Sequence, residues 1–154
     1  MIHGSPDPTV PRRTGVAPPS SQLRSTTMSY TKKNLRDVED MAVKHGFSEN
    51  QEARFARNDL EAEQTGMNYL IIKPGRREAF AHRHRTAEEI YVVLGGSGRV
   101  KLDDELVELA ALDAVRVGPG ITRSFEAGHD GLEVLVFGPH IESDGEMVSD
   151  FWGD

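Results

Sequence analysis

The 154-residue sequence contains no cysteine. Disulfide bonds and thiolate metal sites are therefore excluded, so a metal ion could be bound only through His, Asp, Glu or water. The sequence also lacks an apolar run near the ~20 residues needed to cross a bilayer, and its N-terminus has no apolar run of the signal-peptide type. These absences favour a cytoplasmic protein, and the length favours a single domain.

Basic residues are outnumbered by acidic ones. The formal net charge is −7, and the first 27 residues carry +2 of it, which leaves −9 on the remainder. An acidic surface repels phosphate backbones and anionic lipid headgroups. The sequence therefore predicts neither nucleic acid nor a membrane as a partner.

The first 27 residues differ in composition from the rest of the chain. They hold five of the eight prolines and eight Ser or Thr residues, with almost no large apolar side chains. Such a segment cannot bury enough apolar surface to offset its ordering entropy. Residues 1–27 are therefore predicted to be a disordered leader or tag, and Met28 is a candidate start of the native protein.

Residues 28–140 are predicted to form one β domain, with its core in residues 60–140. Strands are expected over 53–57, 67–72, 88–94, 98–102, 106–109, 114–117, 121–126 and 132–137, and helical spacing of apolar residues predicts a short helix at 35–43. The glycine-rich segment 95–98 is predicted to be a turn. Short strands every eight to twelve residues, with Gly and Pro between them, are typical of a sandwich or barrel. Residues 141–154 are predicted to be an acidic tail whose two aromatic residues pack back on the body or on a partner.

One segment carries candidate metal ligands. His82 and His84 are two positions apart, so in a strand they share a face and can converge on one point. Glu88 could reach the same point from the next strand, because it begins the alternating run 88–94 with Ile90 on its face. Two imidazoles and one carboxylate form a common site for a first-row transition metal, such as Fe, Mn, Ni or Zn.

These residues resemble the first motif of the cupin superfamily, in which a glycine precedes a His-x-His pair. After that pair come three or four residues, a glutamate, six residues and a second glycine. Here Gly75, His82, His84, Glu88 and Gly95 match that order and spacing. The sequence is similar to small single-domain bacterial cupins. The resemblance implies an all-β double-stranded β-helix (jelly-roll) barrel, usually dimeric. No nucleotide cofactor is expected, because neither Lys-Ser/Thr nor a helix follows the glycine-rich segment 95–98.

The second cupin motif is degenerate in this sequence. The family places a histidine, its fourth metal ligand, where this chain has Arg123. Arg123 shares strand parity with Phe125, so it is predicted to point inward. At ~6 Å from a divalent ion and an effective dielectric of ~20, the guanidinium would repel the ion by roughly 5 kcal/mol. Alternatively, Arg123 pairs with Glu88 and replaces the charge of the metal.

Three functions remain open from the sequence. The first is a metal-free module that binds a small anionic ligand, such as a carboxylate, in the barrel through Arg123, His82 and His84. The second is a metal-dependent enzyme of the dioxygenase, isomerase or decarboxylase type, with His82, His84 and Glu88 as metal ligands. The third is a structural barrel without activity. The basic cluster of Arg76, Arg77, Arg83 and Arg85 either attracts an anion to the cavity or is a solvated patch. Exposed strand edges favour a homodimer.

Overall fold

The structure is a computed structural model that describes residues 29–153. The folded unit begins at Thr31. The predicted leader, residues 1–27, and the candidate start Met28 lie outside the described residues. None of the helices in the described part is long and apolar enough to cross a bilayer.

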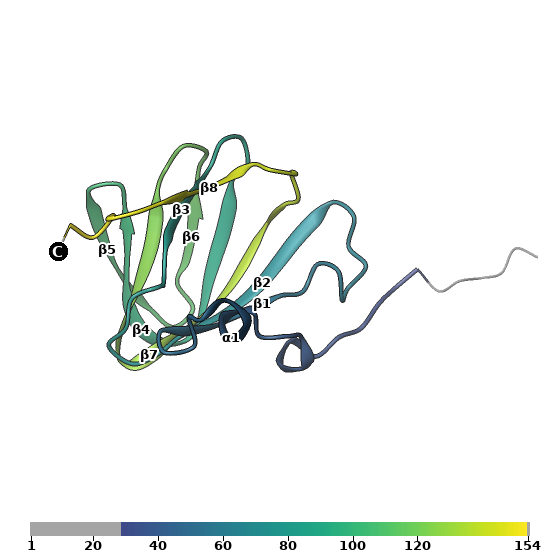
Figure 1. Ribbon diagram of the computed structural model, residues 1–154, viewed down its shortest axis with the longest axis horizontal. Helices are drawn as coiled ribbons and strands as arrows, with labels where there is room; N and C mark the ends of the chain where they lie inside the picture. Colours follow the sequence, from purple (N-terminus) through teal and green to yellow (C-terminus); the bar gives the residue numbers. More distant parts are fainter. Residues whose placement is uncertain (1–28, 154) are drawn as a thin grey trace, which may run out of the picture. The chain divides into compact units, whose positions relative to one another are not determined.

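Residues 31–153 form a curled sheet in which all the strand pairs are antiparallel (Figure 1). Its main path runs β1-β2-β7-β3-β8, and β4 pairs with β5, β6 and β7. The predicted all-β jelly-roll fold is therefore confirmed. The strands are β1 (Gln51–Phe55), β2 (Thr65–Ile72), β3 (Ala81–His84), β4 (Glu89–Leu102), β5 (Glu105–Ala110), β6 (Ala114–Val117), β7 (Arg123–Pro139) and β8 (Gly145–Val148).

Two long strands, β4 and β7, form the centre of the fold and pair along most of their length. The predicted turn at residues 95–98 is wrong, because this segment lies inside β4. A Cβ at Gly96, whose φ is +75°, would lie 2.0 Å from the carbonyl oxygen of Gly131 in β7. Only glycine permits this close approach, so the residues that suggested a turn instead let β4 bend against β7.

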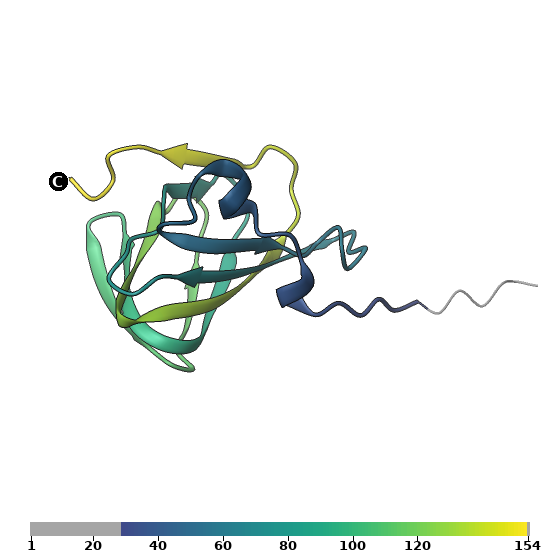
Figure 2. The same cartoon turned by 60° about the horizontal axis from the view of Figure 1, so that its bottom comes forward.

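The predicted helix at 35–43 is divided into two short pieces. A 3₁₀ turn, η1 (Leu35–Asp37), is followed by α1 (Met41–His45). The Asp40 side chain accepts a hydrogen bond from the backbone N–H of Ala42 at 3.0 Å, so Asp40 caps and starts a new helix. The helix α1 lies beside β1, as Figure 2 shows.

The inward face of β4 carries Glu89, Tyr91 and Val93, whereas Ile90 and Leu94 are each 42% exposed. The predicted face assignment, with Glu88 and Ile90 inward, is therefore wrong. Side chains alternate with a period of two, so a shift of one residue exchanges the faces. The sequence could not decide between them because both faces of this strand carry large apolar residues. The core around Tyr91 and Val93 also contains Val100, Phe125, Leu132, Val134 and Val136.

The segment expected to be an acidic tail adds a strand to the sheet. β8 pairs with β3, and His82 is opposite Met147 (Figure 1). Beyond β8, the indole N–H of Trp152 donates to Ser124 Oγ at 3.1 Å, and the Arg77 guanidinium lies 4.5 Å from the centre of the indole ring. Trp152 therefore packs back on the body, as expected.

Candidate metal centre

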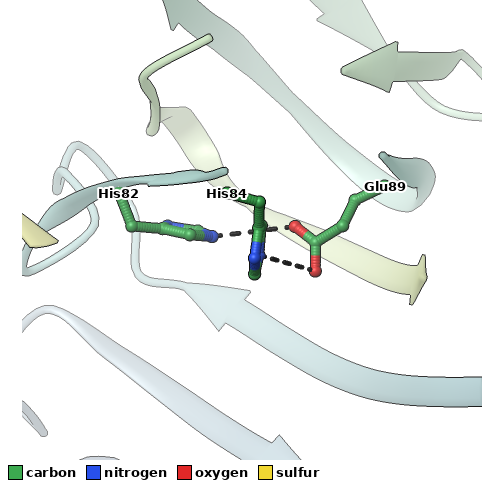
Figure 3. A group of neighbouring side chains, drawn as sticks. All are labelled: His82, His84 and Glu89. Carbon is green, nitrogen blue, oxygen red and sulfur yellow. Dashed lines mark ion pairs between the residues drawn. The ribbon is translucent and has the colours of Figure 1, made fainter. Parts of the chain in front are cut away.

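Strands β3 and β4 bring two histidines and one glutamate together. His82 and His84 are two residues apart on β3 and share one face of that strand, and Glu89 is the first residue of β4. Figure 3 shows the two imidazoles and the carboxylate pointing toward one another. One ligand atom from each of the three side chains lies within 4.8 Å of the other two. His82 and His84 are thus brought together as predicted, but the carboxylate is a different residue.

Both imidazoles present Nε2 to the carboxylate. His84 Nε2 lies 3.3 Å from Glu89 Oε1, and His82 Nε2 lies 3.7 Å from Glu89 Oε2 (Figure 3). The rings are nearly perpendicular, with an interplanar angle of 86° and centroids 5.4 Å apart. The side chains of both histidines are 20% exposed and that of Glu89 is 11% exposed, so the group is largely shielded from solvent.

Glu89 also accepts hydrogen bonds from two buried side chains. The Tyr91 hydroxyl and Arg123 Nη2 both donate to Glu89 Oε2, and Arg123 Nε donates to the Tyr91 oxygen at 2.8 Å. Burial alone would raise the pKa of Glu89, but hydrogen bonds from the histidines, Tyr91 and Arg123 outweigh it and hold that pKa well below its ordinary value. Glu89 is therefore a carboxylate at neutral pH, as a metal ligand must be.

His82 is held neutral. Burial lowers the pKa of His82, and the Arg123 charge lowers it further, against the opposite influence of Glu89. A neutral imidazole keeps a lone pair on one nitrogen, which is the form that binds metals. In the described part of the chain, His82 Nδ1 and His84 Nδ1 are buried without a hydrogen-bond partner.

Asp144 lies behind His84. Its Oδ2 is 3.3 Å from His84 Nδ1, a close electrostatic contact without hydrogen-bond alignment. The carboxylate is fixed by hydrogen bonds from Thr86 N at 2.9 Å, Thr86 Oγ1 at 2.6 Å and Ala87 N at 3.0 Å. The bond from the Thr86 side chain is the main cause that lowers the pKa of Asp144. If an ion took the place of the Nε2 hydrogen, Asp144 would be placed to hold a proton on Nδ1 and to orient the ring. Sequence analysis missed Asp144, because it lies in the presumed tail.

The predicted ligand Glu88 does not belong to this cluster. Its side chain is 54% exposed and its Oε2 accepts a hydrogen bond from Arg116 Nη1 at 2.9 Å. The motif spacing fits both Glu88 with Gly95 and Glu89 with Gly96, because both residue types are doubled. The strand face decides between the two, and it places Glu89 in the site.

Arg123 points inward, as strand parity predicts, and is 0% exposed. Its guanidinium lies behind Glu89 and Tyr91, and its Nη1 donates to the carbonyl of Ile121 at 3.2 Å. It does pair with a carboxylate, but with Glu89 rather than Glu88. Because Arg123 does not line the cavity, the structure does not place it where it could capture an anion.

A central cavity of about 310 Å³ opens at the cluster. Its walls are mostly apolar and include Phe55, Phe80 and Val136. Glu78, which is 6% exposed, also lines it. Burial raises the pKa of Glu78 to about 8, although a long hydrogen bond from Phe125 N, at 3.4 Å, opposes the shift. Glu78 is therefore mainly protonated at neutral pH. Sequence analysis missed it, since a lone Glu in a loop carries no motif.

The basic cluster is largely neutralised at the surface. Arg77 pairs with Glu126, Arg83 pairs with Glu146 at 2.9 Å, and Arg85 donates to the carbonyl of Ser143. None of the four arginines lines the central cavity. This arrangement gives no support to the prediction that the cluster guides an anion.

Comparison with known proteins identifies the family. Residues 68–138 match the family described as "Cupin domain". Residues 68–138 therefore carry a cupin domain. The chain is 31% identical over 80 residues to an uncharacterized protein of Methanocaldococcus jannaschii. That match covers 50% of this chain and 64% of the relative.

Solved cupin structures share the fold. A cupin protein from Bacteroides fragilis superposes with a TM-score of 0.60 at 23% identity, over 75% of this chain and 87% of that one. The polyketide cyclase RemF from Streptomyces resistomycificus superposes with a TM-score of 0.63 at 20% identity, over 77% of this chain and 84% of that one. At these identities the likeness establishes the cupin fold and leaves the activity to the site itself.

Proposed function

We propose that this cupin binds a divalent first-row transition metal ion through His82 Nε2, His84 Nε2 and Glu89, and that a small organic ligand completes the site from the central cavity. The convergence of three ligand atoms within 4.8 Å at the inner end of a cavity carries the proposal. Two histidines and one carboxylate leave coordination positions open for a ligand.

The donor set fits such an ion. Ligands bound at about 2.1 Å in tetrahedral or octahedral arrangement lie about 3.0–3.4 Å from one another. The His84 Nε2 to Glu89 Oε1 distance is 3.3 Å, and the His82 Nε2 to Glu89 Oε2 distance is 3.7 Å. The two histidine nitrogens lie within 4.8 Å of each other, so side-chain rotations that draw them together would bring the set into the required range. Glu89 as a carboxylate and His82 as a neutral imidazole are in the forms that bind a metal.

Neighbouring residues would hold the ligands in place. Tyr91 and Arg123 both donate to Glu89 Oε2, which leaves Oε1 directed at His84. Asp144 fixes His84 from the opposite side. A bound ion would act as a Lewis acid toward an oxygen of the ligand. The protonated Glu78 carboxyl lines the same cavity and is placed to donate a proton or a hydrogen bond to the ligand. Isomerase, decarboxylase and dioxygenase chemistry are all compatible with this arrangement.

A metal-free ligand-binding protein is the second candidate. The Arg123 guanidinium already supplies Glu89 with a positive partner, so the buried carboxylate is neutralised without an ion. In that case the histidines would donate hydrogen bonds to a ligand in the cavity. The two candidates differ in whether an ion binds at Glu89, which a direct titration measures.

The test uses two adjacent glutamates as a matched pair. Purified protein without a polyhistidine tag is stripped with chelator and titrated with Co²⁺ and Zn²⁺ by calorimetry and visible spectroscopy. We expect one ion per chain for the wild type and for Glu88→Gln, and loss of binding for Glu89→Gln and His84→Ala. Uptake below about a tenth of an equivalent after reconstitution, or equal binding by both Gln variants, would overturn the metal proposal.

We also infer a homodimer formed through the edge of β1. In the described part of the chain, β1 pairs with no strand other than β2. On its other edge the N–H groups of Gln51 and Ala53 already donate to Phe47 O and Asp40 Oδ1, so the stretch open to a second strand lies around Phe55. Light scattering coupled to size exclusion should give twice the chain mass. A proline at an outward N–H of β1 should then produce a folded monomer, and a monomeric wild type would exclude this assembly.

A further inference from the structure

A second hollow opens from the same cluster on the side away from Phe80. It has a volume of about 300 Å³, and His84, Glu89, Phe55, Asn68 and Val136 line both it and the central cavity. We call this hollow the polar arm. Beyond the shared wall, its polar lining residues are Arg57, Asn58 and His140.

Arg57 is a cation without a counter-ion in this arm. No carboxylate lies within ion-pair distance of its guanidinium in the described part of the chain. Its Nε is buried without a hydrogen-bond partner among residues 29–153, and its Nη1 makes only a long contact of 3.4 Å to Asn58 Oδ1. The neighbouring Arg54 also has a buried Nε without a partner, but its charge pairs with Glu52 at 2.8 Å, so the missing counter-ion is what distinguishes Arg57. A buried donor without a hydrogen-bond partner lowers the stability of the folded state, so a ligand that brings an acceptor to Arg57 would gain binding energy there.

A third hollow lies on the other side of the central cavity. Its volume is about 360 Å³, and it shares the wall formed by Gln51, Ala53, Phe55, Phe80 and Met147 with the central cavity. We call it the apolar arm, because Met41, Ala42 and Phe47 provide most of its remaining lining. In the described residues, neither the central cavity nor the apolar arm is lined by Lys or Arg.

We propose that Arg57 binds the carboxylate of the ligand in the polar arm and that the ligand is a small amphipathic monocarboxylate. Its apolar body extends through the central cavity toward Phe80 and the apolar arm. A guanidinium forms two parallel hydrogen bonds with a carboxylate, and Arg57 has both a free Nε and free charge for this geometry. The proposal rests on the proposed function, in that the middle of this ligand would lie beside His84 and Glu89.

The charge distribution limits the ligand class. Arg57 is the single Lys or Arg residue that lines the three adjoining hollows in the part of the chain described by the structure. In the metal-free protein, a phosphorylated sugar or a dicarboxylate would leave further negative charge without a partner and close to Glu89 and Glu146, which line the central cavity. A ligand with one carboxylate and an apolar body matches the single cation of the polar arm and the apolar lining of the apolar arm.

Phenylacetate is a suitable probe, because it joins one carboxylate to one aromatic ring. Phenylacetamide is its uncharged isostere, and acetate lacks the apolar body. Binding is measured by calorimetry and by amide chemical-shift changes on full-length protein, with and without Zn²⁺. The variants are Arg57→Gln and, as a matched control, Arg116→Gln, whose parent arginine is exposed and lines none of the three hollows.

We expect phenylacetate to bind the wild type and Arg116→Gln more tightly than either phenylacetamide or acetate. The Arg57→Gln variant should bind it about tenfold to a hundredfold more weakly, with unchanged Zn²⁺ affinity. Equal phenylacetate affinity of wild type and Arg57→Gln, or no binding by the wild type, would overturn the role of Arg57. Absence of Zn²⁺ binding would instead overturn the metal proposal, and the metal-free measurements would still decide the role of Arg57.

Discussion

Replacement of Arg123 by methionine separates the two roles that this arginine plays in the site. Methionine has a similar volume and fits the apolar surroundings, but it removes the charge that neutralises Glu89. The pair is buried, with Arg123 0% exposed and the Glu89 side chain 11% exposed. Breaking a buried pair leaves an uncompensated charge and costs about 3–5 kcal/mol. We expect the metal-free Arg123→Met protein to lose about that much free energy of unfolding, a fall in Tm of about 12–20 °C.

Metal binding should change in the opposite direction. In the wild type the guanidinium repels an ion that binds at Glu89, and at ~6 Å and an effective dielectric of ~20 this repulsion is roughly 5 kcal/mol. Part of this energy is recovered in the variant and part is lost, since Glu89 binds a proton more readily there. We therefore expect Zn²⁺ to bind Arg123→Met at least about tenfold more tightly at pH 8 and to restore much of its stability.

The assay is urea unfolding of the stripped and Zn²⁺-saturated proteins, followed by circular dichroism. Arg116→Met is the matched control, because its ion pair with Glu88 is exposed at both ends and is worth no more than about 1 kcal/mol. Arg123→Lys keeps the positive charge but loses the planar guanidinium that bonds both Tyr91 and Glu89, so its free energy of unfolding should lie between those of the wild type and Arg123→Met. If metal-free Arg123→Met is as stable as Arg116→Met, or binds Zn²⁺ no more tightly than the wild type, the reasoning is refuted.

Three further predictions concern the core and the C-terminal segment. Glu78 has a pKa of about 8 against an ordinary 4.5, so its contribution to stability is complete below pH 4.5 and is lost as pH rises toward 8. In the metal-free Glu78→Gln variant this decline should disappear, so that at pH 8 its free energy of unfolding exceeds that of the wild type by up to about 3–5 kcal/mol. Urea unfolding between pH 5 and 9 measures this difference, and parallel pH profiles for the variant and the wild type would contradict it. Gly96→Ala should cost more than about 2 kcal/mol, because its Cβ would meet the Gly131 carbonyl, whereas an alanine at Gly75 meets no atom within 4 Å and should be milder. Trp152 is the single tryptophan, so its fluorescence reports the packing of the C-terminal segment; Arg77→Ala should shift the emission to the red, and an unchanged spectrum would mean that the stacking contributes little.

The sequence determined the fold class and half of the candidate site. His82 and His84 share a face because they are two residues apart on a strand, and this holds wherever the strand is placed. Arg123 was assigned inward from its parity with Phe125 for the same reason. These are local properties of an extended backbone, which has a period of two.

Only the tertiary structure chose Glu89 over Glu88. The two residues are identical, each fits the motif spacing, and each begins an alternating run with apolar residues. The choice depends on which face of β4 turns toward the core inside the curled sheet, and that core includes residues of β7 that are distant in sequence. The same pairing converted the expected glycine turn at 95–98 into a bend within β4.

Asp144, Glu78 and Arg57 were likewise invisible in the sequence. Each is a common charged residue outside any motif, and its importance comes from what surrounds it: Asp144 behind His84, Glu78 buried in the cavity wall, and Arg57 without a counter-ion. Local periodicity determines which way a side chain points on its own strand. Burial and pairing are set by segments from elsewhere in the chain, so only the folded barrel decided which charges form the site.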